Sequence, residues 1–331
     1  MKIKKSSIIS FSIVTLCFLT LFLIGTFYDL EISKKLVDLE SGNYYSKNFF
    51  GAFFEIVGET PIYWLSIFAG AIVFHNAKRR EKTWITIVFM ILGLAAAVGM
   101  ATYMVSRLFK YSSQHFDFEH LLGGPVDFIC YLLLGGAITF LVFYFMNKIP
   151  SSFYNKMIVW AFVFFAVVIT QRICTTVLKT LASRPRYRAM FMLEDFEMFK
   201  RWYEFQAKPE ILDDWKTLYG ATSDWFKSFP SGHSAAAATV LALIYIPSMF
   251  EKTNNLKVKA IFVSVTVIYT LLVMLSRIVV GAHFLTDVSM GAYITYLCCL
   301  LCDAISKVLV KKIKITPLPE NTKPVLVEES L

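Results

Sequence analysis

Three polar clusters of the sequence contain residue types that could bind and cleave a phosphate. They read Lys-Thr-Leu-Ala-Ser-Arg-Pro-Arg over 179–186, Pro-Ser-Gly-His over 230–233, and Ser-Arg at 276–277 followed by His283 and Asp287. Lysine and arginine supply the charge and the planar donor fork that phosphate oxygens accept from. Histidine can attack phosphorus or move a proton near neutral pH. The combination indicates phosphoryl chemistry.

The spacing within the second and third clusters suggests how their members act. His283 and Asp287 are four residues apart, so on a helix they share a face, and the carboxylate could accept from one ring nitrogen while the other attacks. In the second cluster Ser231 precedes an expected helix, whose unpaired N–H groups could hold a phosphate oxygen. Gly232 allows close backbone approach there, and His233 is expected in the first turn, beside the bound group.

The cationic residues make a metal ion or cofactor unnecessary in this interpretation. Lys179, Arg186 and Arg277 could stabilise the charge of a phosphoryl transition state on their own. One further dense run contains His115, Asp117, Glu119 and His120, but its spacing fits no common zinc site and favours a solvated loop. No metal site and no cofactor are therefore predicted.

The composition indicates that membrane helices position these residues. Of 331 residues, 56% are hydrophobic and 17% charged, which is more apolar than a soluble domain of ordinary composition. Runs of this length can cross a bilayer as helices that satisfy their own backbone hydrogen bonds. An all-α, multi-pass helical bundle with about eight transmembrane helices is expected. The candidate spans are 7–27, 61–75, 84–107, 125–146, 156–181, 233–250, 259–280 and 284–306, of which the second is short.

The basic residues predict the orientation of these spans. The net charge of +9 arises from Lys and Arg in short loops, a topology signal that argues against nucleic-acid binding. Basic loops at 78–82, 148–156 and 252–259 alternate with the loops that contain the three clusters. Both termini are therefore expected in the cytoplasm of a plasma-membrane protein, with the three clusters on the extracytoplasmic side.

The long loop 182–232 leaves two structural alternatives open. Its aromatic residues between Phe196 and Phe205 recur at approximately helical spacing. They are compatible with an amphipathic helix at the membrane interface, where Trp and Tyr are favoured. They are equally compatible with a small packed cap over the bundle.

Together the three clusters resemble the type 2 phosphatidic acid phosphatase superfamily, in its membrane lipid phosphatase branch. The family pattern is Lys-x6-Arg-Pro, Pro-Ser-Gly-His and Ser-Arg-x5-His-x3-Asp. The second and third motifs match completely, whereas the proline expected after Arg186 is Tyr187. The superfamily also includes soluble vanadium haloperoxidases, against which the apolar spans argue. The resemblance implies a six-helix core within 84–310, preceded by an added N-terminal hairpin over 1–83. The tail over 311–331 is expected to be disordered and cytoplasmic, because its polar residues and prolines cannot form an apolar face.

The resemblance also implies a role for each matching residue. His283 attacks phosphorus, Asp287 orients it and His233 protonates the leaving alkoxide, after which water hydrolyses the phosphohistidine. The phosphate-binding residues would be Lys179, Arg186, Ser231, Gly232 and Arg277. The implied function is metal-independent hydrolysis of a lipid phosphate or diphosphate, with phosphatidate-like and polyprenyl diphosphate substrates both admissible. Two alternatives remain open: phosphotransfer to an alcohol, and a non-catalytic lipid-phosphate transporter or scaffold.

Overall fold

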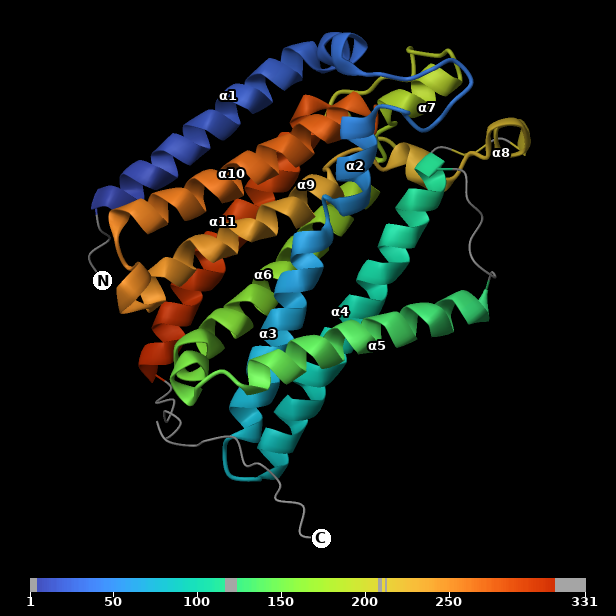
Figure 1. Ribbon diagram of the computed structural model, residues 1–331. Helices are drawn as coiled ribbons and strands as arrows, with labels where there is room; N and C mark the ends of the chain where they lie inside the picture. The colour runs from blue at the N-terminus through green and yellow to red at the C-terminus, as the bar shows by residue number, and fades with distance from the viewer. Residues whose placement is uncertain (1–4, 117–123, 208–209, 212, 313–331) are drawn as a thin grey trace. The chain divides into compact units, whose positions relative to one another are not determined.

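A computed structural model describes residues 5–116, 124–207, 210–211 and 213–312, and most of these residues are helical. Every regular element within those ranges is a helix, and Figure 1 labels α1 to α11. The long α-helices are α1 Lys5–Leu36, α3 Thr60–Lys78, α4 Trp84–Phe116, α5 Pro125–Asn147, α6 Ser151–Ala182, α10 Leu256–Val279 and α11 Leu285–Lys312. The shorter elements are α2 Phe49–Val57, α7 Tyr187–Met192, α8 Asp213–Tyr219, η1 Ser223–Phe226, α9 Gly232–Ala237, η2 Ala238–Met249 and η3 Glu251–Thr253.

Eight helical segments in this described part are long and apolar enough to cross a membrane. The expected fold class, a multi-pass helical membrane protein, is confirmed. The second span differs from the prediction, because it covers Phe49–Lys78 and combines α2 with α3. Glu55 and Glu59 lower the local hydropathy and led to the shorter prediction of 61–75. The expectations for the tail beyond residue 312 and for Asp117, Glu119 and His120 fall outside the described residues.

The chain divides into two compact units, of which the first contains all three clusters. This unit comprises residues 1–59, 170–238 and 267–297. Part of its core is formed by Phe22 of α1, Ala182 at the end of α6 and Phe229 before α9. These apolar contacts bring segments from three distant parts of the sequence together.

The loop after α6 forms a packed cap within the first unit. Its segment 193–206 contains turns and no helix, so the interfacial-helix alternative is wrong. The Phe199 ring lies 5.3 Å from that of Phe284, and the Trp202 ring lies 4.7 Å from that of Phe22. The Trp202 indole also donates to Thr26 Oγ1 at 3.0 Å. The aromatic spacing therefore reflects contacts with α1 and with the start of α11.

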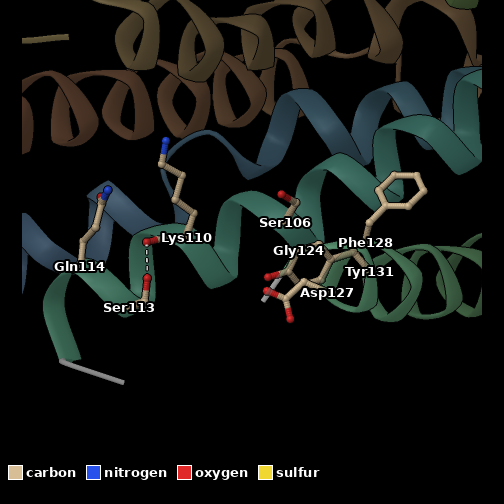
Figure 2. Close-up of a pocket in the computed structure, with 8 residues that line it drawn as sticks. All are labelled: Ser106, Lys110, Ser113, Gln114, Gly124, Asp127, Phe128 and Tyr131. Carbon is tan, nitrogen blue, oxygen red and sulfur yellow. Dashed lines mark hydrogen bonds between the residues drawn. The ribbon is translucent and has the colours of Figure 1, made fainter. Parts of the chain in front are cut away.

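The second unit comprises residues 60–169, 239–266 and 298–331. In it α3 packs on α4, where the Tyr63 and Tyr103 rings are 5.6 Å apart, and the Trp160 indole of α6 donates to the Ala242 carbonyl at 3.0 Å. A pocket of about 510 Å³ lies along α4 and α5 (Figure 2). It is lined by Ser106, Lys110, Ser113, Gln114, Gly124, Asp127, Phe128 and Tyr131. None of these eight residues belongs to the three clusters.

Candidate active site

The three clusters meet where several helices of the first unit begin or end. α6 and α10 end within the first and third clusters, whereas α9 and α11 begin within the second and third. The Ser231 N–H donates to the Asp287 carbonyl at 2.9 Å, and the Ser228 N–H donates to the Arg184 carbonyl at 3.0 Å. These backbone bonds join the clusters to one another, so residues about 100 positions apart in the chain share one site.

His283 lies in the link between α10 and α11, with one ring nitrogen held by the backbone. Its Nδ1 is 2.7 Å from the Ser228 carbonyl oxygen. A carbonyl can only accept, so Nδ1 carries the proton and donates it, which leaves the lone pair of Nε2 free. The side chain is 2% exposed. Burial lowers the pKa of His283 well below its usual value, so the neutral imidazole is favoured.

Asp287 lies in the first turn of α11, where its carboxylate accepts from three donors. Oδ2 accepts from the Phe284 N–H at 2.8 Å, as in a capping box, and from the Ser228 hydroxyl. Oδ1 accepts from Arg184 at 2.6 Å. The distance from Oδ2 to His283 Nδ1 is 3.8 Å, longer than the expected direct hydrogen bond. Asp287 therefore acts on the imidazole by charge and by holding the Ser228 segment.

The second cluster forms the start of α9 and is packed tightly against α11. Ser231 is fully buried, and its side chain accepts from the Ser234 N–H at 3.3 Å, which makes it the N-cap. A Cβ atom placed on Gly291 of α11 would lie 2.3 Å from the Ser231 carbonyl oxygen. A Cβ atom on Gly232 would lie 3.7 Å from Lys179 Cε. Helix α11 and Lys179 thus both approach the backbone of this cluster closely.

His233 is held by two oxygens from the N-terminal part of the chain. Its Nδ1 lies 3.1 Å from Glu59 Oε1, and its Nε2 lies 3.3 Å from the Glu55 carbonyl oxygen. Both His233 and Glu59 are buried, with 7% and 8% exposure. The second cluster therefore depends on α2 and on the residues that follow it.

Arg277 is fully buried and keeps unused hydrogen-bond donors. Its Nη2 donates to Glu55 Oε1 at 2.9 Å, and Arg188 Nη1 donates to the same oxygen at 3.4 Å. Arg277 Nε and Nη1 and Arg188 Nε have no hydrogen-bond partner among the described residues. A buried donor without a partner costs free energy. These N–H groups are therefore available to the oxygens of an anion.

Lys179 and Arg186, the first and last residues of the first cluster, lie against the segment that precedes α9. Lys179 Nζ donates to the Lys227 carbonyl at 2.6 Å, and Arg186 pairs with Asp224 at 2.9 Å between Nη2 and Oδ2. The Arg186 guanidinium lowers the pKa of Asp224 below its usual range. Both cations also contribute to the lowered pKa of His283, which places their charges near its ring.

Tyr187, which replaces the expected proline, begins α7 and is buried. Its ring lies 5.4 Å from Phe196 and 6.5 Å from Phe284. The substitution therefore adds an aromatic contact to the cap and leaves Arg186 next to it in place.

Sequence reasoning missed five charged residues that are paired at the site. Arg184 is 1% exposed and bridges Asp287 to Asp29 of α1, at 3.0 Å between Nη2 and Oδ2 of Asp29. Arg188 pairs with Glu55, and Glu59 contacts His233. The available signal was a charged residue within an apolar run, as for Asp29 and Glu55.

The model of the PAP2 superfamily matches residues 160–310, which run from within α6 to near the end of α11. Residues 160–310 thus form a domain that is similar to the PAP2 superfamily. No curated protein and no solved structure matched the chain. The PAP2 superfamily generally comprises phosphatases, so a phosphatase-type activity on lipid phosphates is supported at the level of the family.

The PAP2 match contains the three clusters but not all of the residues that pair with them. Asp29, Glu55 and Glu59 lie before residue 160, in α1, α2 and the turn that follows α2. Each contacts a charged or histidine side chain of the PAP2 domain. The N-terminal segment thus contributes directly to the arrangement of the site.

Proposed function

We propose that the protein hydrolyses a phosphate or diphosphate ester of a membrane lipid through a phosphohistidine intermediate on His283. The observation that carries this proposal is the hydrogen bonding of the His283 ring, which fixes the nitrogen that bears the proton. Its Nδ1 proton is donated to the Ser228 carbonyl, so the Nε2 lone pair is free. Arg277, with unused buried donors, and Lys179 and Arg186, whose charges act on His283, belong to the same site.

In the first step, His283 Nε2 attacks phosphorus and the bond from phosphorus to the lipid oxygen breaks. The electron pair of that bond stays on the oxygen, which takes a proton from His233. The phosphorylated ring keeps its Nδ1 proton, which it still donates to the Ser228 carbonyl, and the ring gains positive charge. The Asp287 carboxylate, 3.8 Å from Nδ1, stabilises this charge.

In the second step, water attacks phosphorus and gives a proton to His233. The bond from nitrogen to phosphorus breaks, its electron pair returns to Nε2 of His283, and inorganic phosphate leaves. The protonation states of both histidines are thereby restored. Lys179, Arg186 and Arg277 bind the phosphate oxygens together with Ser231 and Gly232. The positive charges of the three cations stabilise the negative charge of the transition state, as a metal ion does in other phosphatases.

The proposed location is the plasma membrane, with both termini in the cytoplasm and the site on the extracytoplasmic side. The even number of candidate spans among the described residues supports both termini lying on the same side of the membrane. The loops at 78–82, 148–156 and 252–259 carry the basic residues typical of cytoplasmic loops. A lipid headgroup exposed in the outer leaflet is the corresponding substrate.

The experiment is phosphate release by the purified protein from a panel of lipid phosphates and diphosphates in detergent, with EDTA throughout. We expect release in EDTA, inhibition by vanadate, and no turnover by His283→Ala, since no other nucleophile is in place. His115→Ala, outside the three clusters, is the matched control and should keep full activity. Substantial release by His283→Ala, or activity restored only by one divalent ion, would refute the proposal. Product analysis with an added alcohol separates hydrolysis from phosphotransfer.

A further inference from the structure

His233 faces a hydrogen-bond acceptor at each of its two ring nitrogens. The Glu59 carboxylate lies 3.1 Å from Nδ1, and the Glu55 carbonyl oxygen lies 3.3 Å from Nε2. A carbonyl oxygen can only accept, and so can the oxygens of an ionised carboxylate. A neutral imidazole has one N–H, so it would turn a lone pair toward one of these oxygens. In a buried site that arrangement is costly, and the doubly protonated ring is the form that satisfies both contacts.

Glu59 occupies a well-anchored turn between α2 and α3. Tyr269 of α10 donates its hydroxyl proton to the Gly58 carbonyl at 3.1 Å. A Cβ atom on Gly58 would lie 3.1 Å from a methyl carbon of Val273, so α10 packs directly on this turn. Glu55, four residues earlier, is itself bonded to Arg277. The carboxylate that faces His233 therefore has a defined position, although it lies outside the PAP2 domain.

We propose that Glu59 is a positioning residue, which holds His233 protonated and oriented as the proton donor for the alkoxide leaving group. The inference rests on the proposed function, and it assigns to the N-terminal segment a role in the chemistry of the PAP2 domain. The substrate oxygen replaces the Glu55 carbonyl as the acceptor for His233 Nε2–H.

The proton balance follows from these contacts. When the bond from phosphorus to the lipid oxygen breaks, that oxygen takes the Nε2 proton, and His233 becomes neutral. Its Nδ1 proton stays on the ring and is donated to the Glu59 carboxylate, which remains ionised throughout. The Nε2 lone pair then faces the reacting groups and can accept the proton of the attacking water. Glu59 thus selects the tautomer that both steps require.

The leaving group distinguishes this role from a structural one. An alkoxide needs a proton as the bond breaks, whereas nitrophenolate is stable without one. We expect Glu59→Gln to lower kcat/KM for a short-chain lipid phosphate by about 10- to 100-fold, less than the full contribution of about 10²- to 10⁴-fold from general acid catalysis, because His233 itself remains. With nitrophenyl phosphate the loss should be less than about threefold. Glu59→Asp should recover part of the lipid phosphatase activity, and Glu40→Gln, on an exposed residue, is the matched control.

The outcomes separate this inference from the proposed function. Equal losses on both substrates, or no loss on the lipid phosphate, overturn the role of Glu59 alone. A wild-type protein that releases phosphate from neither substrate overturns both. If Glu59→Gln does not fold, Glu59→Asp carries the same test, because its ratio of lipid to nitrophenyl activity should still fall below that of the wild type.

Discussion

Arg184 allows a quantitative test of how the site is held together. Its guanidinium bonds to Asp287 at 2.6 Å and to Asp29 at 3.0 Å, and it lies 4.2 Å from the centre of the Phe284 ring. The side chains of Arg184, Asp29 and Asp287 are 1%, 3% and 0% exposed. Arg184→Met keeps most of the volume but leaves two buried carboxylates without their shared cation.

The expected cost follows from the burial of these groups. Breaking a buried ion pair by removing one partner typically costs about 3–5 kcal/mol, because the remaining charge is uncompensated. We therefore expect Arg184→Met to lower the free energy of unfolding by about 3–5 kcal/mol. For a protein of this size the unfolding temperature should fall by at least about 5 °C.

The assay is thermal unfolding in one detergent, for the wild type, Arg184→Met, Asp29→Asn and the double variant. The double variant should lose less stability than the sum of the single losses, since the second change removes one of the carboxylates that the first change left unpaired. A loss below about 1 kcal/mol for Arg184→Met, or strictly additive effects, would show that the three charges do not act as a buried network.

Three further predictions concern packing, pH and orientation. Gly291→Ala places a methyl group against the Ser231 carbonyl and should lower both activity and unfolding temperature, whereas Gly136→Ala, where no atom lies within 4 Å of the added carbon, should do neither. Burial lowers the pKa of His283, so this residue takes up a proton at a higher pH in the unfolded chain, near pH about 6.5, than in the folded protein. The stability of the folded protein should therefore fall as the pH decreases below about 6.5. His283→Gln should show a shallower fall in unfolding temperature over the same range; an unchanged slope would contradict the assignment. With the native cysteines replaced, a cysteine at 223 should react with an impermeant maleimide in intact cells and one at 254 only after permeabilisation; the reverse result would place the site in the cytoplasm.

The sequence by itself determined the membrane class, the number of candidate spans in the described part of the chain, and the resemblance to the PAP2 superfamily. Hydropathy is a local property, because a helix that crosses a bilayer needs about 20 consecutive apolar residues wherever it packs. The motifs are local in the same sense: Pro-Ser-Gly-His and Ser-Arg-x5-His-x3-Asp each occupy one stretch at a helix end. The candidate residues could therefore be named without knowing which helices are neighbours.

Only the tertiary structure decided which charges pair with which. Arg184 and Asp29 are separated by 155 positions, and Arg277 and Glu55 by 222. No periodicity of the sequence predicts such contacts, since they depend on which helix ends lie next to one another in the fold. The carboxylates of the N-terminal segment also misled the span assignment: local hydropathy treats Glu55 as a residue in water, whereas in the folded protein it is buried and bonded to two arginines. The free energy of a buried charge is set by its partners, and the fold brings those partners from distant segments.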